Sequence, residues 1–266
     1  MISFLLDPYR RVFAYWSIFW RTTAVEMRTS YAGSVLGLAW MVLGPILLMS
    51  IYTLVYTVIF RIRPADMTVA DYILHVFSGL LPLLAFSSSI TNGATSLSMN
   101  KQVLLNTVFP SELVPLRAAV IGAAALPIGL VIVLAAAVVL GKIDPVMLLV
   151  PAVLLLQMLF QAGIAWLLAL ATLVLRDVQH ILQYVTIVLL VITPVGYTTD
   201  MIPHRLKMLL YFNPLYYFVV AYQDVVVFNR MPETWILLVC LGISGFTFSF
   251  GYWVFQRAKL AFYDYI

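Results

Sequence analysis

Long apolar segments with few charged residues make up most of the chain after residue 31. The hydrocarbon core of a bilayer is about 30 Å thick, and one transmembrane helix needs roughly 20 apolar residues to cross it. The pattern therefore predicts an all-α integral membrane protein with about six transmembrane helices. We place these spans at about 31–60, 73–97, 116–140, 146–174, 179–197 and 234–255. In the first of them, Gly44 and Pro45 are expected to kink or loosen the helix.

Residues 1–30 show a different pattern, typical of a helix that lies on the membrane surface. Over 7–28 we expect Asp7 to cap the helix and Pro8 to occupy its first position. One face carries apolar and aromatic side chains at helical spacing, namely Tyr9, Val12, Phe13, Trp16 and Trp20. Arginines prefer the other face, so we predict an amphipathic interface helix on the cytoplasmic side, with a simple membrane anchor as the alternative. The charges from Asp7 onward come too early for a cleavable signal peptide.

The segment between the fifth and sixth spans mixes aromatic residues, prolines and charges. Its two apolar stretches, about 206–212 and 215–228, are too short or too interrupted to be confident spans. We interpret 200–228 as a pair of re-entrant or interfacial half-helices on the outer face. The alternative is one more full span, which would move the C-terminus to the other side of the membrane.

The composition supports a lipid environment, since 64% of the residues are hydrophobic and only 10% are charged. A soluble domain is about half apolar and about a quarter charged, so such a chain could not keep its surface hydrated. The transmembrane domain fills 31–266 and leaves no room for a large soluble domain. Six spans place both termini on one side, and that side carries more of the Lys and Arg residues, which predicts cytoplasmic termini. The net charge of +4 is modest and does not indicate a nucleic-acid partner.

Several kinds of chemistry have no sequence signature in this chain. A G-x-x-x-x-G-K-[ST] motif is absent, so the chain has no P-loop for ATP. No His, Cys, Asp and Glu cluster has metal-ligand spacing, and the single cysteine, Cys240, excludes an intrachain disulfide. The predicted spans hold almost no ionisable group, which disfavours an ion-coupled secondary transporter. We interpret His75, near the outer end of the second span, as an interface histidine rather than a proton relay.

Neutral polar and aromatic side chains remain as candidates for function. The polar ones are Gln157 and Gln161 in the fourth span and Ser87, Ser88, Ser89, Thr91 and Asn92 in the second. We favour interhelical hydrogen bonds for them over a polar stripe that guides a hydroxylated substrate. The aromatic ones are Tyr52 and Tyr56 on one face of the first span and Tyr197, Tyr211, Phe212, Tyr216, Tyr217 and Tyr222 near the outer segment. They form either an interfacial belt or a ladder of rings along which sugars slide.

Four blocks, in order along the chain, resemble the membrane subunit of ABC-2 type polysaccharide exporters. They read RTSYAGSVLGLAWMVLGPILLMSIYTLVYTVIF (28–60), NKQVLLNTVFPSELVPL (100–116), VLRDVQHILQYVTIVLLVITPVGYTTDMIP (174–203) and YFNPLYYFVVAYQDVV (211–226). The C-terminal FQRAKLAFYDYI is also typical of this family. The blocks together cover nearly the whole chain, and their order and spacing make the resemblance specific.

The resemblance implies partners and a location. Members of this family pair with a separate P-loop ATPase subunit, which binds ATP and Mg²⁺, and two copies of each chain form the transporter. They export lipid-linked polysaccharides such as O-antigen, capsule or teichoic acid across the bacterial inner membrane, in some cases with periplasmic export proteins. This chain would then be a transport subunit rather than an enzyme, with no cofactor of its own.

The resemblance also implies roles for particular residues. The 98–112 loop would be the coupling helix that docks on the ATPase, with Asn100, Lys101, Leu104, Pro110 and Glu112 matching the family pattern. A cytoplasmic turn near the channel entrance would hold Arg176 and Asp177. The translocation path would be lined by Tyr52, Tyr56, Tyr197, Tyr211, Phe212, Tyr216 and Tyr217.

Three other interpretations fit parts of the pattern. An ABC-2 exporter of drugs or small molecules would also lack a P-loop, but the dense tyrosines favour the polysaccharide branch. An intramembrane transferase acting on a polyprenyl or lipid carrier should show acidic metal-binding loops, and none is present in the sequence. A purely structural scaffold is the third alternative.

Overall fold

The computed structural model describes residues 2–55, 67–106, 109–198, 201–203 and 207–262, and this described part consists of helices joined by turns and loops, with no strand. The all-α prediction is confirmed. Two surface helices come first, α1 (Ile2–Ala14) and α2 (Trp16–Ser30), and the bundle then begins with α3 (Trp40–Thr53) and α4 (Val69–Met99). A short helix, α5 (Lys101–Asn106), leads to α6 (Leu113–Gly122) and α7 (Ala125–Val139). The chain continues through α8 (Val150–Val174), α9 (Val178–Ile192), α10 (Lys207–Phe212), α11 (Pro214–Val226) and α12 (Thr234–Phe262).

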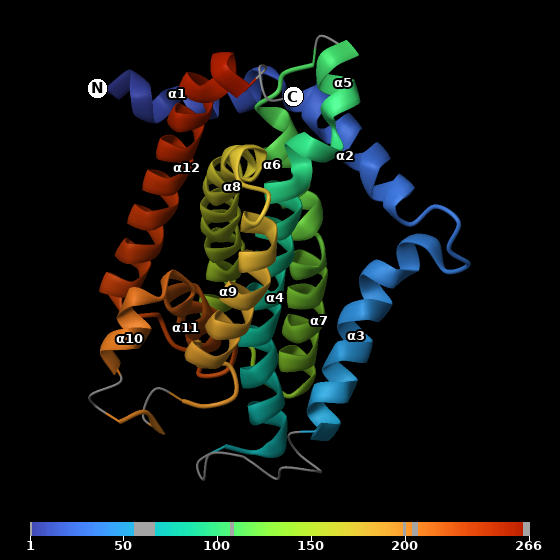
Figure 1. Ribbon diagram of the computed structural model, residues 1–266. Coiled ribbons are helices and arrows are strands. Elements are labelled where there is room, and N and C mark those ends of the chain that lie inside the picture. The colour runs from blue at the N-terminus through green and yellow to red at the C-terminus, as the bar shows by residue number, and fades with distance from the viewer. Residues whose placement is uncertain (1, 56–66, 107–108, 199–200, 204–206, 263–266) are drawn as a thin grey trace.

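Among the described residues, four helical stretches are long and apolar enough to cross a membrane: Val69–Met99, Leu113–Val139, Pro145–Val174 and Thr234–Lys259. Two shorter apolar helices, Gly37–Thr53 and Val178–Ile192, run along the same bundle (Figure 1). The described helices thus agree with a multi-pass membrane protein. The count of six spans stays a prediction, because the two shorter helices fall below the length of a full crossing.

Two of the apolar helices have ends that the hydropathy pattern does not reveal. Helix α3 begins only at Trp40, after a 3-10 turn, because Gly33 and Gly37 adopt φ values of 83° and 50° that interrupt a right-handed helix. Helix α9 ends at Ile192, and Thr193 has an extended ψ of 133°. The next residue is Pro194, whose ring disfavours helical backbone at the residue before it.

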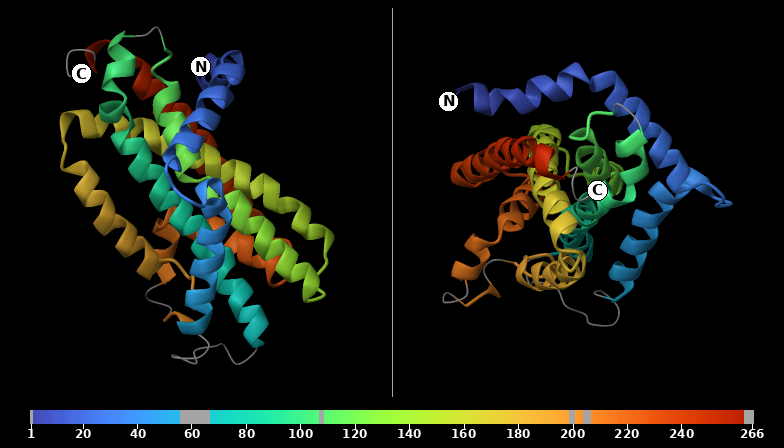
Figure 2. Two further views of the ribbon diagram at one scale, coloured as in Figure 1. Left: turned by 90° about the vertical axis from the view of Figure 1, so that its right-hand side faces the viewer. Right: turned by 45° about the horizontal axis from the view of Figure 1, so that its top comes forward.

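The N-terminal helix differs from the prediction at its start. Asp7 and Pro8 do not begin it, because α1 already starts at Ile2 and includes Pro8 in its interior. The residues before Pro8 contain no helix breaker, so the helix extends across the proline at the expense of one hydrogen bond. A break at Tyr15, with φ −106° and ψ 18°, then separates α1 from α2. Both helices run across the bundle rather than along it, at the end where α5 and the end of α12 lie (Figures 1 and 2).

Helix α4 forms the centre of the bundle and packs against α6, α7, α8, α9 and α11. Its N-terminus is closed by a capping box in which Thr68 and Asp71 exchange side-chain-to-backbone hydrogen bonds. The most extensive contact between two helices joins α8 and α12. There a Cβ atom added to Gly251 would lie 2.2 Å from the carbonyl oxygen of Gly163. Small residues that allow two backbones to approach closely are typical of helix pairs in membranes.

Helices α10 and α11 are the two short helices expected before the last span. They lie at the end of the bundle opposite both termini, and α11 packs on α4 and α12 (Figure 1). At 1.5 Å per residue, the 13 residues of α11 extend about 20 Å, which is too short to cross a bilayer. This length argues against the alternative of an additional full span in this region.

Candidate functional site

The predicted coupling segment begins with a short helix whose side chains divide between the bundle and the outside. In α5, Leu104 is buried, whereas Lys101 and Leu105 are exposed. Pro110, which follows the undescribed residues 107–108, is partly buried. The segment therefore presents a surface at the end of the bundle where both termini lie (Figure 1).

Glu112, at the end of this segment, is clamped to two other helices. Its side chain is buried, and its Oε2 accepts a hydrogen bond of 2.9 Å from Nζ of Lys259 in α12. Its backbone carbonyl accepts a hydrogen bond of 2.8 Å from Nε1 of Trp166 in α8. A movement of the segment would thus be transmitted to α8 and α12.

Asn100, at the other end of the segment, belongs to a second polar cluster. Its Oδ1 accepts a hydrogen bond of 3.1 Å from Nη2 of Arg117 in α6, and its Nδ2 donates to the carbonyl of Ser96 at 2.9 Å. Arg117 also forms an ion pair with Glu26 of α2. Arg117 and Glu26 were not among the site residues predicted from the sequence. Their opposite charges were the only signal, and nothing in the sequence shows that α2 lies beside α6.

Lys101 and Arg176, predicted to serve coupling and entrance separately, line one cavity of about 420 Å³. The cavity lies where α4, α8 and α9 meet, and its polar lining includes Thr95, Thr172 and Gln179. Asp177 is exposed and precedes α9, where its carbonyl accepts the first helical hydrogen bonds, from the backbone N–H groups of His180 and Ile181. The two basic side chains could hold an anionic group at this position.

The predicted aromatic path divides into exposed and buried members. Tyr211 and Phe212 in α10 are exposed by 48% and 77%. Tyr216 and Tyr217 are buried in contact with each other, and the Tyr217 hydroxyl donates to the carbonyl of Tyr211 at 2.7 Å. Of these four residues, only Tyr211 and Phe212 therefore offer open ring surface.

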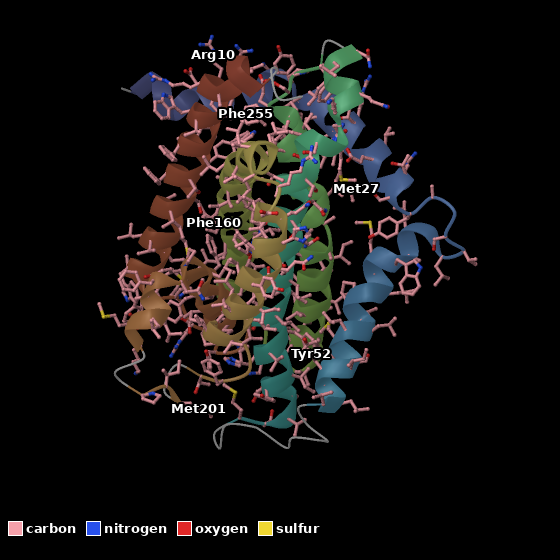
Figure 3. The ribbon with its side chains drawn as sticks, in the orientation of Figure 1. Arg10, Met27, Tyr52, Phe160, Met201 and Phe255 are labelled. Carbon is pink, nitrogen blue, oxygen red and sulfur yellow. The ribbon has the colours of Figure 1, made fainter. Side chains whose placement is uncertain are left out.

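The other predicted path residues lie apart from this pair. Tyr197 is half-buried, and its hydroxyl lies within hydrogen-bond distance of the carbonyls of Val191 and Ile192 at the end of α9. Tyr52 packs partly buried against the core, in the half of the bundle nearest Met201 (Figure 3). Tyr56 lies outside the described residues.

A buried polar network that was not predicted from the sequence holds the short helices in place. Nε2 of Gln223 in α11 donates to the carbonyl of Pro194 at 2.8 Å and also lies near His75 of α4. Asn213 donates to Oγ1 of Thr193 at 2.8 Å, and the hydroxyl of Tyr72 donates to the carbonyl of Gly196 at 2.9 Å. His75 thus takes part in a packing network at the α4–α11 contact.

Two of the predicted interhelical hydrogen bonds are present. Nε2 of Gln157 in α8 donates to the carbonyl of Pro82 in α4 at 2.9 Å, and the hydroxyls of Ser87 and Thr186 join α4 to α9 at 2.9 Å. A carbonyl oxygen has two lone pairs, so that of Pro82 can accept from Gln157 in addition to a backbone donor of its own helix. Among the described residues, no group of three or more His, Cys, Asp and Glu could hold a metal ion.

Comparison with known proteins places this arrangement in a family. The family model described as ABC-2 type transporter matches residues 14–227. Similar curated proteins include the O-antigen export system permease protein RfbA of Myxococcus xanthus, 28% identical over 82% of this chain and 84% of that protein. Two proteins of the same name from Klebsiella pneumoniae are 25% and 24% identical, over 90% and 84% of this chain and 91% and 88% of their own lengths.

Proposed function

The chain belongs to the ABC-2 type transporter family, and from this premise we propose that it is the membrane subunit of an exporter for a lipid-linked cell-surface polysaccharide. The observation that carries the proposal is the family match, together with similarity to O-antigen export permeases over at least four fifths of the chain. O-antigen is the specific polymer that these relatives suggest. Capsule and teichoic acid share the chemistry of a long polymer on a lipid carrier.

A separate P-loop ATPase supplies the energy in this proposal, because the sequence has no P-loop of its own. The ATPase binds ATP and Mg²⁺ and docks on α5, with two copies of each chain in the complex. Both termini then face the cytoplasm of a bacterial inner membrane, and α10 and α11 face the periplasm, where export proteins could dock. The exposed side chains of α5 support a docking surface at this end of the bundle.

Export then proceeds as a shift between two arrangements of the bundle. ATP binding changes the position of the α5 surface, and the clamps at Asn100 and Glu112 transmit the movement to α6, α8 and α12. Lys101 and Arg176 hold the anionic linkage of the lipid carrier at the entrance, and the polymer leaves past Tyr211 and Phe212. The extent of the shift is limited by the difference in the partner's affinity for the two arrangements.

The first test is purification of the tagged protein from detergent, followed by an ATPase assay. We expect a P-loop subunit to copurify in equal amount. We expect Lys101→Glu to lower the coupled ATPase rate about tenfold, because charge reversal at an interface replaces attraction with repulsion. Lys207→Glu, at the opposite end of the molecule, is the matched control and should leave the rate unchanged.

Three results would contradict the proposal or narrow it. A folded chain that purifies without any ATPase would point to an enzyme or a scaffold. Equal ATPase rates for the Lys101→Glu and Lys207→Glu variants would show that the docking surface does not lie on α5. A complex whose ATPase responds to small amphiphiles and not to the lipid-linked polymer would indicate a drug exporter.

The exposed aromatic pair provides a test of the exit path. Replacing both Tyr211 and Phe212 with alanine should reduce the polymer at the cell surface several-fold, because sugar rings would lose flat apolar faces to pack on. The protein should still fold, since both side chains are exposed. Met208→Ala with Leu209→Ala removes exposed, non-aromatic side chains from the same helix and is the control. Equal surface polymer in both double variants would favour the interfacial-belt interpretation.

A further inference from the structure

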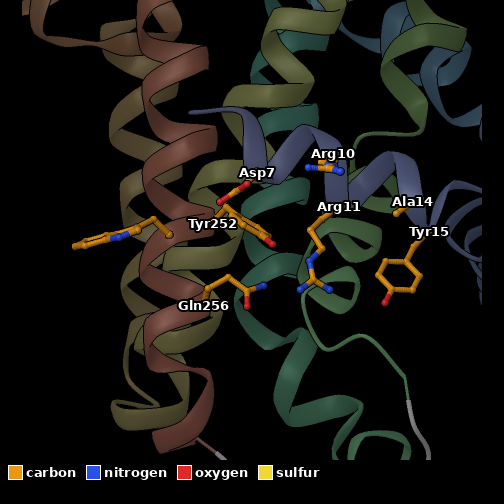
Figure 4. Close-up of a pocket in the computed structure, with 8 residues that line it drawn as sticks. Asp7, Arg10, Arg11, Ala14, Tyr15, Tyr252 and Gln256 are labelled. Carbon is orange, nitrogen blue, oxygen red and sulfur yellow. The ribbon is translucent and has the colours of Figure 1, made fainter. Parts of the chain in front are cut away.

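A cavity of about 570 Å³ lies between α1 and α12, outside the coupling and exit regions described above. Its lining includes Arg10, Arg11, Tyr15, Tyr252, Trp253 and Gln256 (Figure 4). Two basic side chains from a surface helix therefore meet polar and aromatic side chains from the last transmembrane helix. The proposed export mechanism uses none of these residues.

The walls of this cavity are fixed by packing. The ring of Tyr9 in α1 lies against Phe248 of α12 with a centroid distance of 4.9 Å, and Pro8 is buried. On α12, the ring of Tyr252 packs against Trp166 of α8 at 5.5 Å. The pKa of a tyrosine hydroxyl is ordinarily about 10, and burial raises the pKa of Tyr9 further, so this contact is neutral at physiological pH.

Among the groups that face the cavity, the guanidinium groups of Arg10 and Arg11 and Nε2 of Gln256 lack an acceptor in the described part of the chain. Arg10 and Arg11 are exposed and form no ion pair with any residue that the structure describes; Asp7, the acidic side chain at the rim, is not within ion-pair distance of either. In Figure 4 the ends of the Arg11, Tyr252 and Gln256 side chains point toward one another. Nε2 of Gln256 is shielded from solvent and makes no hydrogen bond to the described part of the chain. Guanidinium, amide N–H and phenol O–H groups together suit the oxygens of a phosphate.

The position of the cavity relative to the membrane identifies the source of this phosphate. Phe13, Trp16 and Trp20 of the two surface helices are exposed by 72%, 47% and 45%, which is the pattern of helices embedded at the level of lipid headgroups. On α12, the guanidinium of Arg257 lies over the ring of Trp253 at 4.5 Å. A phosphate carried by a lipid is concentrated at this level, whereas a free phosphate is not.

We propose that this cavity binds the headgroup of an anionic phospholipid, from the leaflet on the side where both termini lie. Basic pockets beside transmembrane helices are a recurrent form of lipid recognition. The lipid phosphate bridges Arg11 of α1 to Gln256 of α12, with Arg10 at the opening, and its acyl chains extend into the bilayer beside α12. The lipid thereby fastens the surface helix to the last transmembrane helix.

The test measures lipid binding to the purified full-length protein, with any partner that copurifies. The delipidated protein is titrated in detergent with phosphatidylglycerol, with phosphatidylcholine of the same acyl chains, or with inorganic phosphate. Bound lipid is counted by native mass spectrometry, and the melting temperature is followed in parallel. We expect phosphatidylglycerol to bind about tenfold more tightly than phosphatidylcholine, which corresponds to ~1.4 kcal/mol, and inorganic phosphate to leave the melting temperature unchanged.

Variants locate the site. Arg10→Gln with Arg11→Gln should abolish the preference for phosphatidylglycerol, and the neutral change Gln256→Leu should weaken it. Arg21→Gln with Arg28→Gln removes the same charge from α2, away from the cavity, and should retain the preference. Any one of three results would overturn the proposal. Inorganic phosphate could raise the melting temperature as much as phosphatidylglycerol does, or the two lipids could bind equally well. The third result is an undiminished preference for phosphatidylglycerol in the Arg10 and Arg11 double variant. These outcomes do not depend on export or ATP hydrolysis, so they are separate from the test of the proposed function.

Discussion

Gly251→Ala should lower the stability of the protein by at least about 2 kcal/mol, because the added methyl group would overlap the backbone of α8. Its Cβ atom would lie 2.2 Å from the Gly163 carbonyl oxygen. Backbone atoms cannot rotate away as a side chain can, so α8 and α12 must separate along their main contact. We expect the apparent melting temperature in detergent to fall by roughly 5 °C or more. Gly163→Ala should have a similar effect, since its Cβ atom would lie 2.3 Å from the backbone of Thr247.

Gly245→Ala on the same helix is the matched control. A Cβ atom at Gly245 meets no atom within 4 Å, so the variant should be as stable as the wild type or slightly more stable. Alanine favours a helix over glycine by up to about 1 kcal/mol, which sets the sign of the small effect. Equal melting temperatures for the Gly251→Ala and Gly245→Ala variants would show that α8 and α12 do not pack as described.

Glu112→Ala should destabilise the protein and uncouple ATP hydrolysis from export, while membrane insertion is retained. Breaking a buried ion pair costs about 3–5 kcal/mol, but the Lys259 side chain is 31% exposed, so we expect a loss nearer 2 kcal/mol. Insertion should be unchanged, since the apolar spans remain intact. The uncoupling follows because the segment after α5 would lose its side-chain contact with α12. The measurement is the number of ATP molecules hydrolysed per exported polymer, alongside the melting temperature.

A double-mutant cycle separates the ion pair from other effects. The variants are Glu112→Gln, Lys259→Met and the two together. If the pair matters, the double variant should be more stable than the sum of the single losses predicts, by about 1 kcal/mol or more. Strictly additive losses would show that Glu112 and Lys259 act independently, and only the hydrogen bond from Trp166 to the Glu112 carbonyl would remain as the clamp.

The large-scale organisation of the molecule could be predicted from the sequence. The long apolar segments, the surface helices before Trp40 and the two short helices before α12 all follow from residue-by-residue hydropathy and periodicity. The free energy of moving a helix into a bilayer is a sum over its residues, so the sequence alone is sufficient to predict where the apolar helices lie. The absence of a P-loop motif can also be established from the sequence, because that motif is contiguous.

Helix boundaries and polar contacts were harder to predict from the sequence. The interruption before α3 depends on left-handed backbone at Gly33 and Gly37, and hydropathy carries no information on φ. Asp7 and Pro8 matched a helix start, yet α1 begins at Ile2. The pairing of Glu26 with Arg117 and of Glu112 with Lys259 joins residues far apart in sequence.

The sequence by itself determined that this is an all-α membrane protein of the ABC-2 type, and that it carries no P-loop motif. Only the tertiary structure decided which glycine contacts the backbone of another helix, which tyrosines are exposed and which charged residues form ion pairs. Gly245 and Gly251 lie on the same helix among similar residues, and only Gly251 meets another backbone. Transfer into a membrane depends on what each residue is, whereas packing depends on which faces of which helices meet. Which helix faces meet is decided by the packing of the whole bundle, so no short stretch of sequence reveals it.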